Sequence, residues 1–376
     1  MSKLGNRPLV PLNIRDLSPY VAGKTIAEVK EEYDPPEISK LASNENRLGC
    51  SSHVQPQVVK AMQEIQDYPD PASGQLREVL ADENNIDPEN IIVGAGSESL
   101  IANLCRTFFL NNEEAVTADA TFVGFFVQGN IRGISIKKIP VTDDYRYDLN
   151  AMADAISERT KMVYIANPNN PTGTYITRSE FEQFMRKVPS DVLVVMDEAY
   201  FEFAQDVSDY PHSLRYDFDN VITLRTFSKA YGLAGFRVGY GIASKKIITE
   251  MMKTKLTFEP TVAAQAAALA ALGDPAFLKK TKDVVNEGKK RLYKFFEEHG
   301  VSYVSSISNS VMMVLPTEQA AIDFTQKMLE QGVILRRINA FGLPNCVRIT
   351  IGRKKEMRHF ERSFKNLIEA QELPSI

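Results

Sequence analysis

Lys229 stands in a segment that is an unusual setting for a surface lysine. Hydroxyls, aromatics and a glycine surround it in Thr226-Phe-Ser-Lys229-Ala-Tyr-Gly232, and Arg237 follows eight residues after the lysine. A lysine in this setting suits a site that holds an anion. Taken singly, Lys229 would more often be a solvated lysine, so a chemical role depends on the other residues that the fold brings to it.

Three further segments place polar residues directly after apolar runs. Asp197 ends the run Val194-Val-Met-Asp197, and a carboxylate there is costly to bury without a cation or a hydrogen-bond donor. The loop Asn167-Pro-Asn-Asn170-Pro-Thr-Gly173 is rigid enough to hold a side-chain amide at a fixed point. The segment Gly94-Ala-Gly96-Ser97-Glu98 opens a helix whose first amides favour a bound phosphate. Each segment alone could be a turn or a solvated neighbour; together they describe one ligand.

The elements that must position these residues follow an alternating pattern. Short runs rich in Val and Ile alternate with helical segments, which is typical of a doubly wound, mainly parallel α/β sheet. Such sheets bind ligands at the carboxyl ends of their strands, so the four segments should meet at one edge. We expect strands at 90–93, 114–117, 135–139, 161–166, 192–196 and 221–224.

The pattern changes along the chain and predicts three parts. Residues 1–48 read as an N-terminal arm that joins a small domain, and residues 49–275 read as the large domain. Residues 276–376 contain long helical stretches and further strands, including one expected at 333–338, and read as a smaller α+β domain.

Composition favours an ordinary soluble globular protein of the cytoplasm. The 376 residues are 44% hydrophobic and carry a formal net charge of −4, so no strong positive field draws the chain to nucleic acid or anionic membranes. The three cysteines are far apart and lack metal-ligand spacing, which favours a reducing compartment and predicts no metal site. The first residues show no secretion signal, and no apolar run has transmembrane length.

The motifs NNPTG, DEAY, TFSK and GFRVG, in this order, resemble the large-domain signature of the fold-type-I pyridoxal-phosphate aminotransferases. Other segments extend the resemblance to the histidinol-phosphate aminotransferase family over nearly the whole chain. These segments are Ser18-Pro-Tyr20, Lys40-Leu-Ala-Ser-Asn44-Glu-Asn46, Asp67-Tyr-Pro-Asp70, Ala120-Thr-Phe122 and Cys346-Val-Arg348-Ile-Thr-Ile-Gly352.

The resemblance implies a role for each residue around the cofactor ring. Lys229 would bind pyridoxal phosphate covalently and then move a proton of the substrate. Asp197 would pair with the ring nitrogen, so that the ring can accept electrons. Asn170 and Tyr200 would bind the phenolic oxygen, and Phe122 would stack on the ring.

The resemblance also assigns the two ends of the site. The cofactor phosphate would be held by Gly96, Ser97, Glu98, Thr226, Ser228, Arg237 and, from the second subunit of a homodimer, Tyr68. Arg348 would bind the carboxylate of the amino-acid substrate, and Arg336 would bind the phosphate of histidinol phosphate. Tyr20, Asn44 and Asn170 would complete the substrate site. The expected reaction converts histidinol phosphate and 2-oxoglutarate to imidazole-acetol phosphate and glutamate.

Three departures from the family pattern leave alternatives open. Arg47 replaces a usual proline, the loop Phe258-Glu259-Pro-Thr261 carries a carboxylate, and Phe122 and Phe126 stand where tyrosines are common. Arg47 could pair with Glu259. An aromatic amino-acid aminotransferase is the alternative function, and a phosphothreonine decarboxylase a further one. A regulator with an aminotransferase-like module is disfavoured, because the short segment before the large domain shows neither a helix-turn-helix pattern nor a basic stripe.

Overall fold

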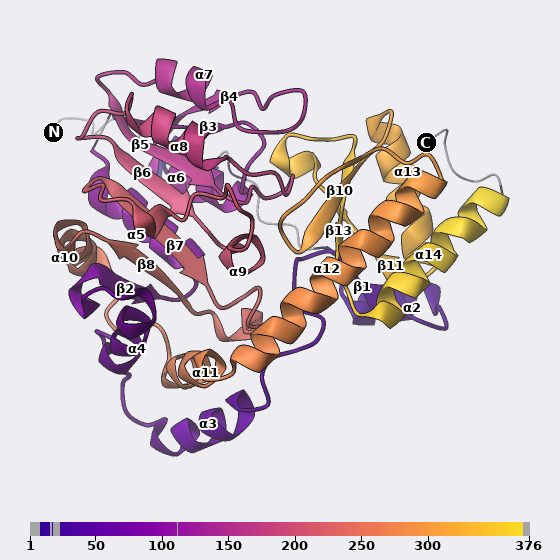
Figure 1. The fold of residues 1–376 in the computed structure, drawn as a ribbon, viewed down its shortest axis with the longest axis horizontal. Helices are drawn as coiled ribbons and strands as arrows, with labels where there is room; N and C mark the ends of the chain where they lie inside the picture. The colour runs from indigo at the N-terminus through magenta and orange to yellow at the C-terminus, as the bar shows by residue number, and fades with distance from the viewer. Residues whose placement is uncertain (1–7, 16, 18–22, 111, 371–376) are drawn as a thin grey trace, which may run out of the picture.

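A seven-stranded sheet forms the centre of the larger part of the molecule in the computed structural model, which describes residues 8–15, 17, 23–110 and 112–370 (Figure 1). Its order is β2-β8-β7-β6-β5-β3-β4, and β8 alone runs antiparallel to its neighbours. The strands are β2 (Ile91–Gly94), β3 (Glu114–Ala118), β4 (Ser135–Ile139), β5 (Thr160–Ala166), β6 (Leu193–Asp197), β7 (Val221–Thr226) and β8 (Gly239–Ala243). The predicted mainly parallel α/β fold is therefore confirmed.

Successive side chains of the buried strands point to opposite sides, so both faces of this sheet are apolar. Helices cover both faces. Val195 packs with Leu104 and Ile248, and its neighbour Val194 packs in a separate core with Phe181. The helices of the larger part are α3 (Val54–Ala61), α4 (Gly74–Asn84), α5 (Ser97–Phe108), α6 (Val123–Arg132), α7 (Leu149–Asp154), α8 (Arg178–Met185), α9 (Phe201–Ala204), α10 (Lys245–Thr254) and α11 (Val262–Leu272).

Strand β8 was not among the expected strands, and its glycines explain why. Glycine weakens a strand pattern because it offers no side chain to pack. Here the glycines permit close approach: a Cβ on Gly239 would lie 2.7 Å from the backbone nitrogen of Ser97. Strand β8 thus brings the chain after Arg237 directly against the start of α5.

A four-stranded antiparallel sheet, in the order β12-β13-β10-β9, lies beside the larger part (Figure 1). Its strands are β9 (Tyr303–Val304), β10 (Ser310–Val314), β12 (Arg336–Arg337) and β13 (Cys346–Thr350). The helices α12 (Pro275–Glu298), α13 (Glu318–Glu330) and α14 (Lys354–Glu369) pack with it through one core.

The N-terminal segment joins this smaller part, as the sequence predicted. Strand β1 (Ser39–Lys40) pairs in parallel with β11 (Val333–Ile334), and helix α2 (Ile26–Tyr33) follows a capping box at Thr25. The single strand expected at 333–338 was wrong, because β11 pairs with β1 whereas β12 turns to pair with β13. The domain boundaries at residues 48 and 275 stay a prediction.

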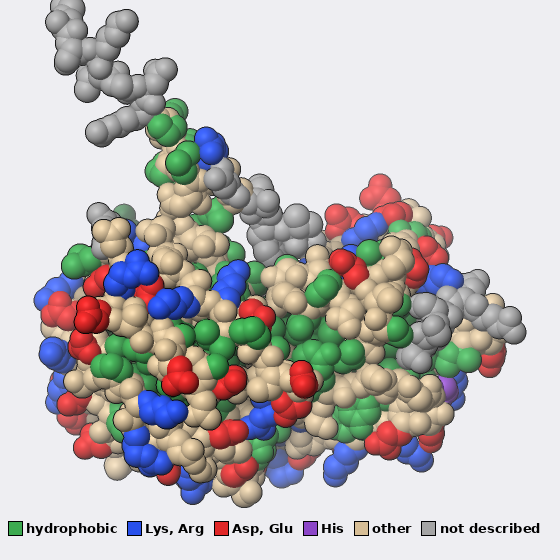
Figure 2. Space-filling model, turned by 90° about the horizontal axis from the view of Figure 1, so that it is seen from above, with side chains coloured by type: hydrophobic (Ala, Val, Ile, Leu, Met, Phe, Trp, Pro, Cys, Tyr) green, Lys and Arg blue, Asp and Glu red, His purple; other side chains and the backbone are tan. Residues whose placement is uncertain are grey.

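The remaining elements are short. They are α1 (Leu12–Arg15) and the 3₁₀ turns at Met62–Glu64, Pro88–Asn90, Ser213–Arg215, Ala234–Phe236 and Asn339–Phe341. Basic and acidic side chains are interspersed over the face seen in Figure 2. Among the residues with described placement, none of the helices is both long and apolar enough to cross a bilayer.

Candidate active site

The carboxyl ends of three neighbouring parallel strands meet in one cavity. Strands β5 and β6 end in register, with Ala166 opposite Asp197, and Asp197 in turn lies opposite Leu224 of β7. A cavity of about 220 Å³ opens there. Ten predicted site residues line it: Ser97, Glu98, Phe122, Asn170, Asp197, Tyr200, Thr226, Ser228, Lys229 and Arg237.

Asp197 is the buried carboxylate of the cavity, with only 4% of its surface exposed. Its Oδ2 accepts a hydrogen bond from the Tyr164 hydroxyl at 2.5 Å, and its Oδ1 accepts one from the Ala199 amide at 3.2 Å. Burial raises the pKa of Asp197 to about 6, although both hydrogen bonds act in the opposite direction. The carboxylate is thus poised to pair with a cationic group in the cavity.

Lys229 lies on the same cavity and is only partly exposed. Its Nζ donates to the Ser43 carbonyl at 3.3 Å and lies 5.9 Å from the centre of the Tyr200 ring. Burial, together with the positive charges of Arg348 and Arg237, lowers the pKa of Lys229 to about 8. An amine with this pKa is neutral in a useful fraction of molecules near pH 7, which nucleophilic and proton-transfer roles both require.

The opposite end of the cavity suits a phosphate. The Thr226 hydroxyl donates to Ser228 Oγ at 3.0 Å, and Arg237 Nη1 lies 3.4 Å from the same Ser228 oxygen. Helix α5 begins at this corner, since its first residues Ser97 and Glu98 line the cavity, and Gly96 precedes them with φ +85°. The positive φ favours glycine at this position, and a Cβ at Gly96 would lie 2.7 Å from Arg237 Nη2 and displace the guanidinium from the helix start.

Arg348 links the smaller sheet to the cavity. It projects from β13 and is 5% exposed, its Nη1 donates to Asn170 Oδ1 at 2.5 Å, and its Nη2 donates to the Ala42 carbonyl at 2.8 Å. Arg336 of β12 lies directly opposite Arg348 in the strand register, so both residues share one face of the sheet. Two predicted substrate arginines are therefore neighbours.

Tyr200 and Asn44 are joined by a hydrogen bond that the sequence did not indicate. Asn44 Nδ2 donates to the Tyr200 hydroxyl at 2.8 Å, while Thr350 Oγ1 donates to Asn44 Oδ1 at 3.0 Å. Asn44 is 1% exposed and is not part of the cavity lining, and its role in substrate binding stays a prediction. Burial raises the pKa of Tyr200, which keeps its hydroxyl protonated.

Of the other predicted residues, Arg336 lines a separate cavity with Val123 and Lys327. Two more, Tyr68 and Tyr20, lie apart from the active-site cavity or outside the described residues. Tyr68 is 78% exposed and stacks on Phe258 with ring centres 4.2 Å apart. Tyr20 lies outside the described residues.

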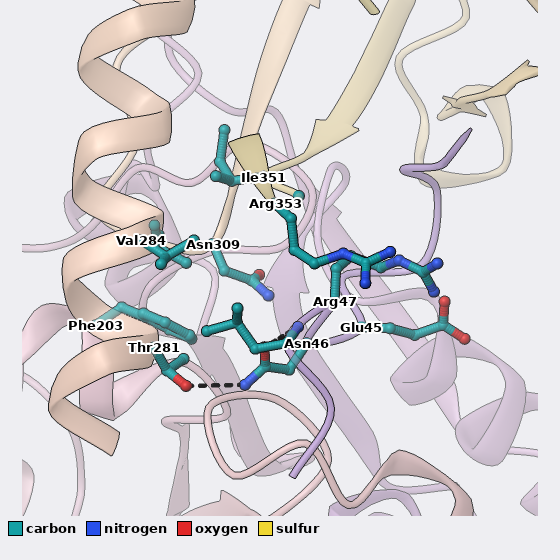
Figure 3. Close-up of a pocket in the computed structure, with 12 residues that line it drawn as sticks. Glu45, Asn46, Arg47, Phe203, Thr281, Val284, Asn309, Ile351 and Arg353 are labelled. Atoms are coloured by element: carbon teal, nitrogen blue, oxygen red, sulfur yellow. Dashed lines mark hydrogen bonds between the residues drawn. The ribbon is translucent and has the colours of Figure 1, made fainter. Parts of the chain in front are cut away.

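The hypothesis that Arg47 pairs with Glu259 was wrong. Arg47 Nε donates to Glu356 Oε1 at 3.0 Å, beside the start of α14, and Ser99 donates to Glu259 at 3.3 Å. Figure 3 shows Arg47 beside Arg353 at a small cavity, where Asn46 Nδ2 donates to Thr281 Oγ1 at 3.0 Å. The linings of this cavity and of the candidate active site share no residue.

Glu198 is not a solvated neighbour of Asp197. It is fully buried, accepts from the Ser213 hydroxyl at 2.6 Å, and pairs with Arg225 Nη2 at 2.9 Å. The Arg225 guanidinium also lies 3.4 Å from the centre of the Phe201 ring. The second acid of the DEAY motif therefore joins a structural network behind the cavity.

The residues present fit pyridoxal phosphate on three observations. The buried Asp197 carboxylate suits a pyridinium, the Lys229 amine suits an aldehyde, and the space that glycine leaves at Gly96 is bordered by Arg237 and helix amides. Tyr164 and Thr350 belong to this site but were missed. Tyr164 gives no sequence signal of its own, because only the register with β6, in which it lies opposite Val195, places it on the face of Asp197.

Comparisons with known proteins identify the family of the chain. The model of the family "Aminotransferase class I and II" matches residues 36–364. A histidinol-phosphate aminotransferase from Geobacillus sp. (strain WCH70) is 41% identical, over 97% of this chain and 99% of its own length. The histidinol-phosphate aminotransferase of Bacillus subtilis (strain 168) is 40% identical, over 92% of this chain and 95% of its own.

Solved structures show the same fold. The histidinol-phosphate aminotransferase from Sinorhizobium meliloti in complex with pyridoxal-5'-phosphate has a TM-score of 0.88 and 26% identity, covering 98% of this chain and 99% of that one. Aspartate aminotransferase from Thermus thermophilus with maleate shares the fold at a TM-score of 0.80 and 21% identity, over 94% of this chain and 99% of that one. The predicted fold type and cofactor are confirmed, and the chain belongs to the pyridoxal-phosphate-dependent class I and II aminotransferase family.

Proposed function

We propose that this enzyme transfers an amino group between histidinol phosphate and 2-oxoglutarate. The observation that carries the proposal is the register pair Arg336–Arg348, which provides two guanidinium groups on one face of the smaller sheet. Arg348 would bind the carboxylate of glutamate as a fork, and Arg336 would bind the phosphate of histidinol phosphate. The names of the relatives from Geobacillus and Bacillus support the same substrate.

The chemistry would be divided between the cofactor and the protein. When bound, pyridoxal phosphate supplies an electron sink for the electron pair left at the substrate's alpha carbon. Lys229 Nζ would hold the cofactor at rest and, once released by the incoming amine, take the proton from that carbon. Asp197, kept ionised above a pKa of about 6, would hold a proton on the ring nitrogen.

The other cavity residues would orient the cofactor. Asn170 and Tyr200 would hydrogen-bond the phenolic oxygen, and Phe122 would pack on the ring face. The phosphate would accept hydrogen bonds from the first amides of α5 and from Thr226, Ser228 and Arg237. A cofactor held both at its phosphate and at its ring nitrogen would have little freedom to rotate. Its reacting carbon would therefore stay near Lys229.

We also propose a homodimer in which Tyr68 reaches the phosphate of the neighbouring site. Tyr68 stacks on Phe258, and the same two segments carry further exposed apolar side chains, namely Val59, Met62, Ile65 and Leu256. An aromatic and aliphatic area of this kind is typical of a subunit interface. A cytoplasmic location stays a prediction that depends on the three scattered, unpaired cysteines.

The alternative aromatic amino-acid substrate receives less support from the geometry. Phe126 is buried and is not part of the cavity lining, so the apolar replacement there does not reach a substrate. Phe122 does line the cavity, where it would pack on the cofactor ring rather than on the substrate.

A half-reaction panel tests the proposal. The spectrum of the holoenzyme would be followed with histidinol phosphate, glutamate, phenylalanine and tyrosine. Histidinol phosphate and glutamate should convert the cofactor fastest, and Arg336→Gln should raise the KM for histidinol phosphate at least about tenfold. The matched control is Arg337→Gln, because the neighbouring Arg337 pairs with Glu318 at 3.0 Å instead. Fast conversion only by the aromatic amino acids, or carbon dioxide release without a keto acid, would overturn the assignment.

A further inference from the structure

Tyr164 is a buried residue that contacts Asp197 but does not itself line the cavity. It lies in the middle of β5 with no exposed surface, and its hydroxyl reaches Asp197 Oδ2 at 2.5 Å. Its ring is fixed by parallel stacking on Phe125, with centres 4.3 Å apart and planes 6° apart. The strand pleat explains the contact, because Tyr164 lies opposite Val195, two residues from Asp197 on the same face.

The direction of this hydrogen bond is determined by the two groups. The pKa of Tyr164 is raised well above its ordinary value by burial and by the nearby Asp197 charge, so the phenol keeps its proton. The Tyr164 hydroxyl therefore donates and the carboxylate accepts. Oδ1 of Asp197 is held by the Ala199 amide, so both oxygens are fixed and the carboxylate cannot rotate about its final bond.

We propose that Tyr164 is a positioning residue that keeps Asp197 ionised and fixed in rotation, so that the site is already charged when pyridoxal phosphate arrives. The inference rests on the proposed role of Asp197. A buried carboxylate without a donor favours its neutral form, which cannot attract the pyridinium of the cofactor. The Tyr164 hydroxyl would thus extend tight cofactor binding to lower pH, because it favours the ionised form of Asp197.

The test is the pH dependence of cofactor affinity in full-length apoenzyme titrated with pyridoxal phosphate. Tyr164→Phe retains the stack on Phe125 and removes only the hydroxyl. The ratio of its Kd to the wild-type Kd should be near one at pH 9 and should rise to about tenfold at pH 6, because Asp197 stays protonated to higher pH in the variant. The titrations of the phosphate and of Lys229 cancel in this ratio.

Two comparisons separate this mechanism from a loss of packing. Tyr210→Phe is the matched control, because Tyr210 is equally buried but donates to the Asn167 carbonyl, and its Kd ratio should be flat with pH. In an Asp197→Asn background, Tyr164→Phe should produce no pH-dependent change. If Tyr164→Phe does not fold, 3-fluorotyrosine at position 164, a stronger donor, should lower the ratio below one at pH 6.

A Kd ratio for Tyr164→Phe that is the same at every pH, or unchanged Kd values, would overturn the inference. If Asp197→Asn itself bound the cofactor as tightly as wild type, the proposed role of Asp197 would fail instead. The two failures are thereby distinguishable.

Discussion

Asn44 donates a hydrogen bond to the Tyr200 hydroxyl across 2.8 Å, although 156 residues separate the two in sequence. The proton arrangement follows from Thr350, whose Oγ1 accepts from the Asn44 backbone amide and donates to Asn44 Oδ1. The Asn44 side chain must therefore present its NH₂ group to Tyr200. One lone pair of the Tyr200 hydroxyl oxygen accepts the hydrogen bond from Asn44. The hydroxyl proton of Tyr200 is therefore directed away from Asn44, toward the cavity that Tyr200 lines.

The first prediction concerns the hydrogen-bond chain from Thr350 through Asn44 to Tyr200. Thr350→Val should lower kcat/KM by about fivefold to tenfold, because the Asn44 amide loses the partner that fixes its orientation. Thr350→Ser retains the hydroxyl and should remain within about twofold of wild type. Steady-state kinetics on both variants provide the measurement. Equal losses in the two variants would indicate packing rather than hydrogen bonding.

The second prediction concerns the buried pair of Arg225 and Glu198. Arg225→Met should destabilise the enzyme by about 3 kcal/mol, because it leaves the fully buried Glu198 carboxylate without its cation. Lys253→Met removes an exposed pair with Glu250 and should cost no more than about 0.5 kcal/mol. Urea denaturation at one protein concentration measures both. A stable Arg225→Met enzyme would contradict the structural role of this network.

The third prediction is a pH dependence of stability through Glu114. Burial alone would raise its pKa, but hydrogen bonds from Lys137, Ser157 and Thr160 lower the pKa of Glu114 to about 2. Because the folded pKa is depressed, the stabilisation is full above the ordinary value near 4.5 and is lost as pH falls toward 2. The Tm difference between wild type and Glu114→Gln should therefore shrink between pH 5 and about pH 2. A difference that is constant over this range would contradict the assignment.

The fourth prediction tests whether Tyr68 acts across a dimer. Tyr68→Ala and Lys229→Ala subunits, each nearly inactive alone, should regain activity when they are unfolded, mixed and refolded together. Up to about a quarter of wild-type activity is expected, since half of the dimers are hybrid and each hybrid has one intact site. Wild type carried through the same refolding provides the reference. No regain of activity would place Tyr68 and Lys229 of one site on the same subunit.

Much of the site could be predicted because its residues follow strands in sequence. Asp197 and Asn170 are polar residues at the ends of apolar runs, and the parallel sheet brings such ends together. Thr350 could not be predicted, because it reaches Asn44 across 306 residues through contacts that no local pattern encodes. Tyr164 reads as one more core aromatic in β5, since only the register with β6 reveals the carboxylate beside it.

The fold shows the same division between local and long-range information. The Val-rich run that forms β6 is evident from the sequence. Strand β8 is not, because glycines interrupt its apolar pattern, and one of them, Gly239, is needed for the close contact with Ser97. The break between β11 and β12 depends on two different partner strands: β11 pairs with Lys40, which is far away in the chain, and β12 pairs with the neighbouring strand at Arg348. Periodicity therefore predicts elements, but strand partners decide where a strand ends.

The most direct test of the account is the site of cofactor attachment. The holoenzyme would be reduced with borohydride, digested and analysed by mass spectrometry, with Lys229→Ala treated alike. A second buried lysine provides an internal comparison: burial also lowers the pKa of Lys289 of α12 to about 8. Lys289 donates to the Ser306 carbonyl and is not part of the cavity lining. The account predicts the reduced cofactor on Lys229 alone and none on Lys229→Ala. Attachment at Lys289 or at any other lysine in the active wild-type enzyme would contradict it.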